Sequence, residues 1–236
     1  MDKTGKHIFP DADFGQIVWT TRKGMRSITM RLKRGGLYVC TSPYQQKSNM
    51  LKVVETYRKR LLSLRAEVSY SHFDWTYSIQ TECFHLCVKP SGLKNYTLRQ
   101  DNDDAVVFCP QSTDFSDKRV QEMIYHFILK ALFQRAEEYL LLRLSYWSHY
   151  WNLPVNGVRI TKARSYWGNC TSKKQINLSC FLMLLPAYLI DYVILHELAH
   201  TKEMNHSPRF WELLNSMTVN HALDLRKELR NYHPIF

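Results

Sequence analysis

Three histidines and a glutamate stand close together in residues 193–211, VILHELAHTKEMNHSPRFW. His196 and His200 are four residues apart, so on a helix their imidazoles point the same way, about one turn apart. That spacing lets both rings meet one zinc ion at about 2.0–2.1 Å. Glu197 points aside from the pair, where its carboxylate can accept a proton from an activated water molecule. The segment therefore predicts a zinc site with a general base, in the H-E-x-x-H arrangement.

The third ligand is expected to be His206, which follows the predicted end of the histidine helix. Asn205 is expected to take the left-handed conformation that ends that helix and turns the chain back. Glu203 is the alternative ligand, although its helical position favours a hydrogen bond to the free N–H of His200. Glu212 and Glu228 are competitors further along the chain. Three ligands leave one coordination position open, which is typical of a catalytic zinc site.

The composition favours a folded protein whose default location is the cytoplasm. The chain has 236 residues, of which 45% are hydrophobic, enough for one substantial core or two small modules. The first residues lack the apolar segment of a secretory signal, and no apolar stretch approaches the roughly 18 residues that span a membrane. No internal repeat is evident. Six scattered cysteines without a C-x-x-C pair indicate reduced, mostly buried thiols.

The net charge of +11 makes nucleotides, nucleic acid or an anionic surface possible partners. The basic residues occur only in short groups, which favours ordinary surface charge. A peptide or protein substrate is the leading expectation, and the oligomeric state stays open.

Two regions are expected, a strand-rich one over residues 1–115 and a metal-binding one over residues 116–236. Residues 16–43 and 67–110 alternate apolar and polar side chains, as strands do, around a helix predicted from residue 49 to residue 65. A long helix follows, with Ser116 as the expected N-cap. Two strands joined by a turn near Gly168 and Asn169 come next, and Pro186 marks the start of the histidine helix. The last helix is predicted to begin at Ser207 and Pro208.

The strand KQINLSC, residues 174–180, is expected to form a wall of the cleft. A free edge there would let an extended peptide add as another strand. The alternative is an ordinary core strand. Converging Arg164, Lys173 and Lys174 would instead favour a nucleotide substrate.

The segment from Ala163 to Leu214 resembles the YgjP-like metallopeptidase domain, a relative of the SprT-like proteases. The resemblance lies in a W-G-x-C turn, an I-N-L strand, an I-D-Y-V-x-x-H-E-L-x-H helix and an M-N-H-S-x-x-F-W segment. It is strong over residues 155–215 and looser over the first half. The chain departs from the family pattern at Tyr166 and Asn169, where the family usually has Arg and Ser.

This resemblance implies an α+β fold, a zincin-like metallohydrolase core with an N-terminal antiparallel strand-rich region. It implies that His196, His200 and His206 bind zinc and that Glu197 is the catalytic base. Further candidates for the surroundings of the metal or the substrate are Glu203, Asn177, Trp167 and Arg164, the last as a substitute for the missing family arginine. The expected function is a zinc-dependent peptidase. The alternatives are a nucleotide triphosphate pyrophosphatase and a nucleic-acid-associated protein with a zinc site.

Overall fold

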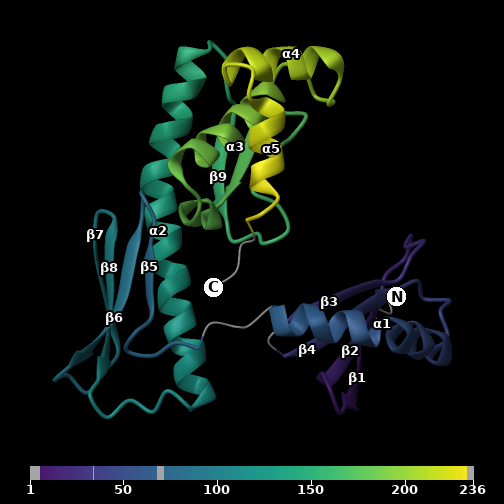
Figure 1. Cartoon of the computed structure of the whole chain (residues 1–236). Helices are drawn as coiled ribbons and strands as arrows, with labels where there is room; N and C mark the ends of the chain where they lie inside the picture. The colour runs from purple at the N-terminus through teal and green to yellow at the C-terminus, as the bar shows by residue number, and fades with distance from the viewer. Residues whose placement is uncertain (1–5, 34, 68–71, 233–236) are drawn as a thin grey trace. The chain divides into compact units, whose positions relative to one another are not determined.

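Residues 6–33, 35–67 and 72–232 are described by the computed structural model of the chain (Figure 1). The chain divides into two compact units, residues 1–71 and residues 72–236. This division lies earlier than the boundary expected after residue 115. The reason is packing, because the strands between residues 78 and 110 share one apolar core with the long helix and with the chain that follows it. Residues 151–232, which contain the expected metal ligands, are called the metal-binding half.

The first unit is a four-stranded sheet followed by one helix. Its strands have the order β1-β2-β4-β3, with bounds β1 (Lys6–Asp11), β2 (Gly15–Thr21), β3 (Thr29–Lys33) and β4 (Gly36–Thr41). Helix α1 (Lys47–Glu67) then supplies Met50, Val54 and Leu61 to a core that also contains Trp19 and Leu37. The unit therefore has an apolar core of its own.

The second unit begins with a sheet of the same strand order. Its strands are β5 (Ser78–Gln80), β6 (His85–Ser91), β7 (Thr97–Asp101) and β8 (Asp104–Pro110), in the order β5-β6-β8-β7. Helix α2 (Lys118–Tyr150) follows. The two sheets share not only order but direction, since the first pair and the last pair are antiparallel and the middle pair is parallel in each. The structure thus contains a topological repeat that the sequence does not reveal.

The expected α+β fold class is confirmed, but the strand-rich region is mixed rather than antiparallel. In each sheet a hairpin folds back so that its second strand, β4 or β8, lies between its own partner and an earlier strand. That placement makes β2 and β4 parallel, and likewise β6 and β8.

Helix α2 extends past the sheet and along the metal-binding half (Figure 1). Its N-cap is Asp117, whose side chain accepts a hydrogen bond from the Arg119 N–H. The expectation of Ser116 was wrong, because the Ser116 hydroxyl bonds to Asp114 instead. Fully buried residues continue from Ile124 to Leu140, so one face of α2 packs against other elements for most of its length.

The metal-binding half combines a small sheet with three helices. The sheet has the order β10-β11-β9, with β9 (Gly157–Thr161), β10 (Gly168–Cys170) and β11 (Gln175–Ser179). A 3-10 turn η1 (Cys180–Leu184) leads to α3 (Ala187–Ala199), α4 (Pro208–Met217) and α5 (Ala222–Leu229). Gly168 and Asn169 are therefore strand residues rather than a turn, and the turn lies between β10 and β11.

The central position of β11 contradicts the prediction of a free edge at residues 174–180. Strand β11 pairs with β10 on one side and with β9 on the other. The alternation of Ile176 and Leu178 with polar residues indicates that one face of the strand is buried. Burial of a face does not determine which edges of the strand are paired. The outer strand of this sheet that packs against α3 is β10.

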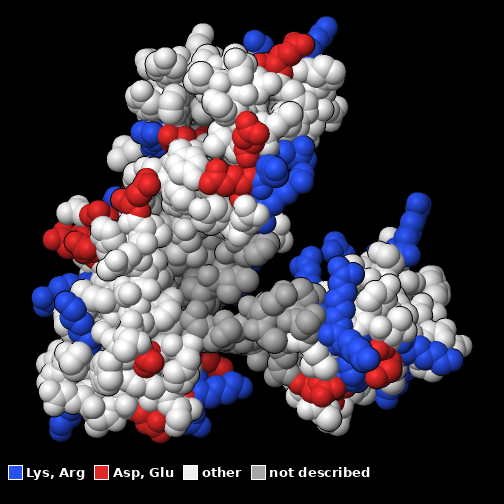
Figure 2. Space-filling model, viewed as in Figure 1, with Lys and Arg blue, Asp and Glu red and all other residues white. Residues whose placement is uncertain are grey.

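Among the residues that the structure describes, no helix combines the length and hydrophobicity needed to cross a bilayer. On the face seen in Figure 2, Lys and Arg side chains occur in small groups with Asp and Glu between them.

Candidate metal centre

The three histidines converge on one point. His196 lies in the last turn of α3, His200 caps that helix, and His206 follows in the segment before α4. The Nε2 atoms of His196 and His206 are 3.1 Å apart. One ring nitrogen from each of the three lies within 4.8 Å of the others. The arrangement presents three nitrogen donors to a single position.

Local turns bring the third histidine back. Helix α3 ends at Ala199 with His200 as its cap, so the helix stops earlier than the expected end at Asn205. Asn205 is not among the described residues with a positive φ. Ser207 then caps α4 as expected, because its hydroxyl accepts a hydrogen bond from the Phe210 N–H. The short connection between the two helices carries His206 toward α3.

A backbone contact orients the His200 ring, and one aromatic ring packs against all three imidazoles. The Nδ1 atom of His200 is 3.0 Å from the backbone oxygen of Glu203, which leaves Nε2 facing the other histidines. Glu203 therefore acts through its carbonyl group rather than its carboxylate. The ring of Phe210 lies 4.5 to 5.0 Å from the imidazoles of His196, His200 and His206. Phe210 therefore packs against all three imidazoles. It belongs to the F-W motif but was not expected as a site residue.

Burial keeps two of the imidazoles neutral. The pKa of His196 is lowered to about 3, mainly by burial and then by the neighbouring His200 and His206. Burial also lowers the pKa of His200. A neutral imidazole has a free lone pair for a metal ion, so these rings need not lose a proton at neutral pH before binding one.

These donors fit a divalent metal of the zinc type. Nitrogens bound to one tetrahedral ion at 2.0–2.1 Å lie about 3.3 Å apart, close to the 3.1 Å between His196 and His206. The Nδ1 atom of His196 is buried and has no hydrogen-bond partner among the described residues, so no hydrogen bond at that atom orients the ring. Imidazole ligands suit zinc, copper, iron and nickel rather than magnesium or calcium.

Glu197 lies beside the histidines and is only 5% exposed. Its pKa is raised to about 8 by burial, and the hydrogen bond from the Cys170 N–H opposes that rise. Gly168 leaves the room for this carboxylate, since a Cβ at that position would lie 2.8 Å from Glu197 Cγ and 3.0 Å from its Oε1. Strand β10 thus positions Glu197 through one missing side chain and one backbone donor.

A cavity of about 240 Å³ opens on this group. Its lining residues come from β10 and the residue before it, from α3, from the segment between α3 and α4, and from α5. They are Trp167, Gly168, Tyr192, Val193, His196, Glu197, His206, Arg226 and Leu229. A larger hollow of about 520 Å³ lies between α2 and β9, but no histidine lines it. The smaller cavity is therefore the candidate active site.

The other residues expected near the site divide into two groups. Trp167 lines the cavity, as does Gly168 from the same motif. Arg164 does not line it, because its guanidinium packs over the rings of Tyr125 and Phe181. Asn177 is also absent from the lining, and its amide donates to Asn169 on the neighbouring strand.

Two lining residues with polar side chains, Tyr192 and Arg226, were not expected as site residues. Tyr192 stands one helical turn before His196, on the buried face of α3. Arg226 comes from α5, which packs against α3, and no sequence spacing signals that contact. Burial raises the pKa of Tyr192 to about 12, so its hydroxyl keeps its proton at neutral pH.

Comparison with known proteins gives one extensive match. The profile of the YgjP-like, metallopeptidase domain matches residues 26–232. No curated protein matches the chain. Two solved metallopeptidase zymogens resemble it, abylysin of Pyrococcus abyssi and jannalysin of Methanocaldococcus jannaschii. Each is 20% identical over 39% of this chain, covering 92% and 94% of the other chain with TM-scores of 0.36 and 0.35. The domain match spans most of the chain and is the comparison that identifies the family.

Proposed function

Because this chain belongs to the YgjP-like metallopeptidase domain family and is a metallopeptidase, we propose that it is zinc-dependent and that Glu197 is its general base. The observation that carries the proposal is the meeting of three imidazoles, His196, His200 and His206, with one buried carboxylate at a single cavity. Three protein ligands and an open position are what a catalytic zinc site has.

Zinc, when bound, polarises a substrate carbonyl and makes water a stronger acid. The protein's own part is proton transfer. Glu197 takes the proton of the attacking water and delivers it to the nitrogen of the leaving amine, so one carboxylate serves as base and then as acid. The Cys170 N–H holds the carboxylate in place for both steps.

The outer strand β10 is the proposed docking edge for the substrate backbone. Backbone hydrogen bonds join Trp167 to Ser179 and Thr171 to Gln175, so the alternate residues Gly168 and Cys170 turn their backbone groups to the opposite edge. The Cys170 N–H is used by Glu197, which leaves the Gly168 groups and the Cys170 carbonyl for an extended peptide. Added-strand pairing supplies affinity without requiring a particular side chain.

The nucleotide alternative gains no support from the cavity. Arg164, Lys173 and Lys174 do not line it, and Arg226 is the one Lys or Arg among its lining residues. A triphosphate needs several converging cations. We therefore propose no second function.

Metal analysis tests the assignment of ligands. Purified protein should carry about one zinc per chain, and His196→Ala or His206→Ala should lose it. Glu203→Ala should keep it, since the Glu203 contact uses the backbone. His126→Ala is the matched control because His126 is an exposed histidine on α2. Unchanged zinc in both ligand variants would disprove the site, and loss in Glu203→Ala alone would make Glu203 the ligand.

A further inference from the structure

A buried phenol without a partner faces the metal centre. Tyr192 is 2% exposed and lines the cavity together with His196 and Glu197. Its hydroxyl oxygen is buried and has no hydrogen-bond partner among the described residues. An unpaired buried hydroxyl costs about 1–3 kcal/mol, so this one requires an explanation, which a substrate group bound in the cavity would supply.

A cation with no acidic partner lines the same cavity. Arg226 forms no ion pair with any described residue. Its guanidinium is held 5.2 Å above the ring of Trp211. It lines the cavity together with Tyr192 and two of the histidines, His196 and His206. Stacking on Trp211 therefore positions this cation at the wall of the cavity.

These two groups lack the same thing, an anionic acceptor. Guanidinium has only donors, and a protonated phenol without a partner has a donor to offer. Two donors from different elements suit the two oxygens of a carboxylate, and hydrogen bonds to a charged acceptor are about twice as strong as neutral ones. Peptides carry carboxylates on Asp and Glu side chains and at their C-terminal end. The net charge of +11 attracts such substrates at longer range.

We propose that Tyr192 and Arg226 form a carboxylate-binding subsite beside the metal centre, which makes the enzyme prefer peptides with a carboxylate close to the bond that is cut. The subsite determines specificity, and it takes no part in proton transfer. The proposal rests on the peptidase function proposed above. The carboxylate comes from an acidic side chain or from the end of the substrate chain, and the experiment separates these two sources.

Binding is measured by calorimetry on the zinc-loaded Glu197→Gln protein, which removes the proposed base. The probes are a neutral pentapeptide blocked at both ends, the same peptide with Glu at each position in turn, and the neutral peptide with a free C-terminal carboxylate. At least one carboxylate peptide should bind about tenfold tighter than the neutral one. A preference for one Glu position identifies a side-chain subsite, and a preference for the free end identifies a chain-end subsite.

Variants then assign the preference to the two residues. Arg226→Gln should reduce the ratio of carboxylate-peptide affinity to neutral-peptide affinity to below about twofold. Arg226→Lys should keep part of the ratio, and Tyr192→Phe should reduce it by several-fold. Lys227→Gln is the matched control, because it removes one exposed positive charge from the same helix. Thermal unfolding of each variant checks that the fold is intact.

Three results would overturn the proposal. They are equal affinity for neutral and carboxylate peptides, a preference that survives in Arg226→Gln, and an equal loss in Lys227→Gln. The second result would mean that the carboxylate binds the metal alone, and the third that general charge attracts it. The same titrations on metal-free wild-type protein need no turnover. A protein that cuts no peptide but keeps the ratio would refute the peptidase function and leave the subsite standing.

Discussion

The two sheet-and-helix regions, residues 6–67 and 78–150, share a topology but serve different ends. In the first, Thr29 pairs with Cys40 across β3 and β4, and in the second Thr97 pairs with Phe108 across β7 and β8, so the same register recurs 68 residues later. The first region closes on its own core. The core of the second continues into the metal-binding half. One arrangement of strands is thus a separate unit in one place and a scaffold in the other.

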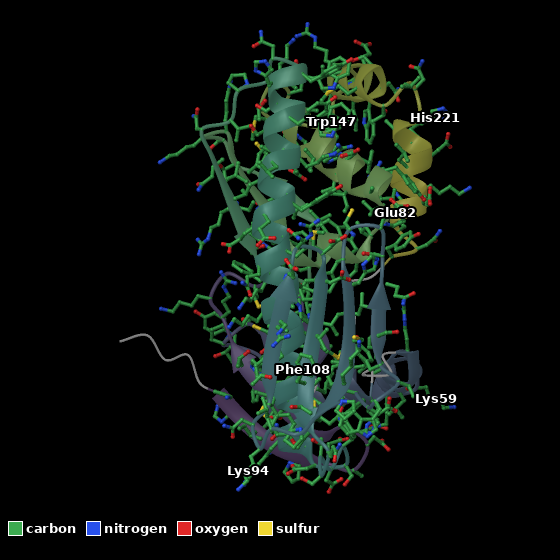
Figure 3. The ribbon with its side chains drawn as sticks, turned by 90° about the vertical axis from the view of Figure 1, so that its left-hand side faces the viewer. Lys59, Glu82, Lys94, Phe108, Trp147 and His221 are labelled. Carbon is green, nitrogen blue, oxygen red and sulfur yellow. The ribbon has the colours of Figure 1, made fainter. Side chains whose placement is uncertain are left out.

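The difference lies in a longer helix and in one turn. Helix α2 has 33 residues against 21 in α1. Its last turns carry Arg143 and Trp147, and both donate hydrogen bonds to Asp191 on α3. The turn between β5 and β6 adds Glu82, whose carboxylate accepts from the Ala187 N–H at the start of α3. Figure 3 labels Glu82 and Trp147, which lie at different levels along the metal-binding half.

Equivalent cavities in the two helices should have unequal consequences. Leu132→Ala in α2 and Met50→Ala in α1 each remove a fully buried side chain and should cost about 2–5 kcal/mol. Hydrogen exchange read by mass spectrometry should show faster exchange of the β5–β8 strands and of α3 in Leu132→Ala, with weaker zinc binding. Met50→Ala should affect residues 6–67 alone. Equal loss of zinc affinity in both variants would show that the first region supports the metal site as well.

The pH dependence of stability should have opposite signs in the two regions. The pKa of Glu197 is raised from 4.5 to about 8, so its contribution to stability is full below about pH 4.5 and is lost as pH rises toward 8. Arg58 lowers the pKa of Asp11 from 3.8 to about 2, so that contribution is present above pH 3.8 and is lost as pH falls through 2.

Urea unfolding of metal-free protein checks both signs. Glu197→Gln should gain on wild type by about 2–4 kcal/mol between pH 4.5 and pH 8. Asp11→Asn should be about 1–2 kcal/mol less stable than wild type at pH 6 and should approach it near pH 2. A Glu197→Gln advantage that is constant with pH would mean that the carboxylate is not held in a desolvated position.

Two glycines offer a matched steric test. Gly168→Ala places a Cβ against Glu197 and should lower peptide hydrolysis by about 10- to 100-fold while zinc stays bound. Gly36→Ala places a Cβ against the backbone oxygen of Gln16, at a φ of +130°. This variant should destabilise residues 6–67 and leave hydrolysis per folded molecule unchanged. Full activity in Gly168→Ala would show that the Glu197 carboxylate does not depend on strand β10.

The smallest effect is expected from two indole hydrogen bonds. The Trp147 indole N–H donates to the Asp191 carboxylate and the Trp19 indole N–H donates to the Thr41 hydroxyl, each with a donor–acceptor distance of 2.8 Å. Replacing either by Phe should cost about 1–2 kcal/mol, but only Trp147→Phe should weaken zinc binding, by a few-fold. Chelator competition measures this difference. The same zinc affinity in both variants would mean that the contact to Asp191 does not orient α3.

The sequence predicted which histidines meet better than it predicted the walls of the cavity. His196, Glu197 and His200 follow from helical spacing, which is a local property. The approach of Arg226 to Tyr192 depends on how α5 packs against α3, and the edge position of β10 depends on strand order, so neither has a local signature. The sequence does not reveal the repeat, because the two sheets share their strand register but not the types of their core residues. Leu37 and Ala105, which stand at equivalent positions, show this difference.

The central claim is that a zinc ion on three histidines works with Glu197 as the base, and one comparison tests it most directly. Zinc content and peptide hydrolysis are measured on the same preparations of wild type and Glu197→Gln. We predict equal zinc, about one per chain, and a loss of hydrolysis of at least about 100-fold, because only proton transfer is removed. Near-normal turnover by Glu197→Gln with its zinc in place would contradict the account.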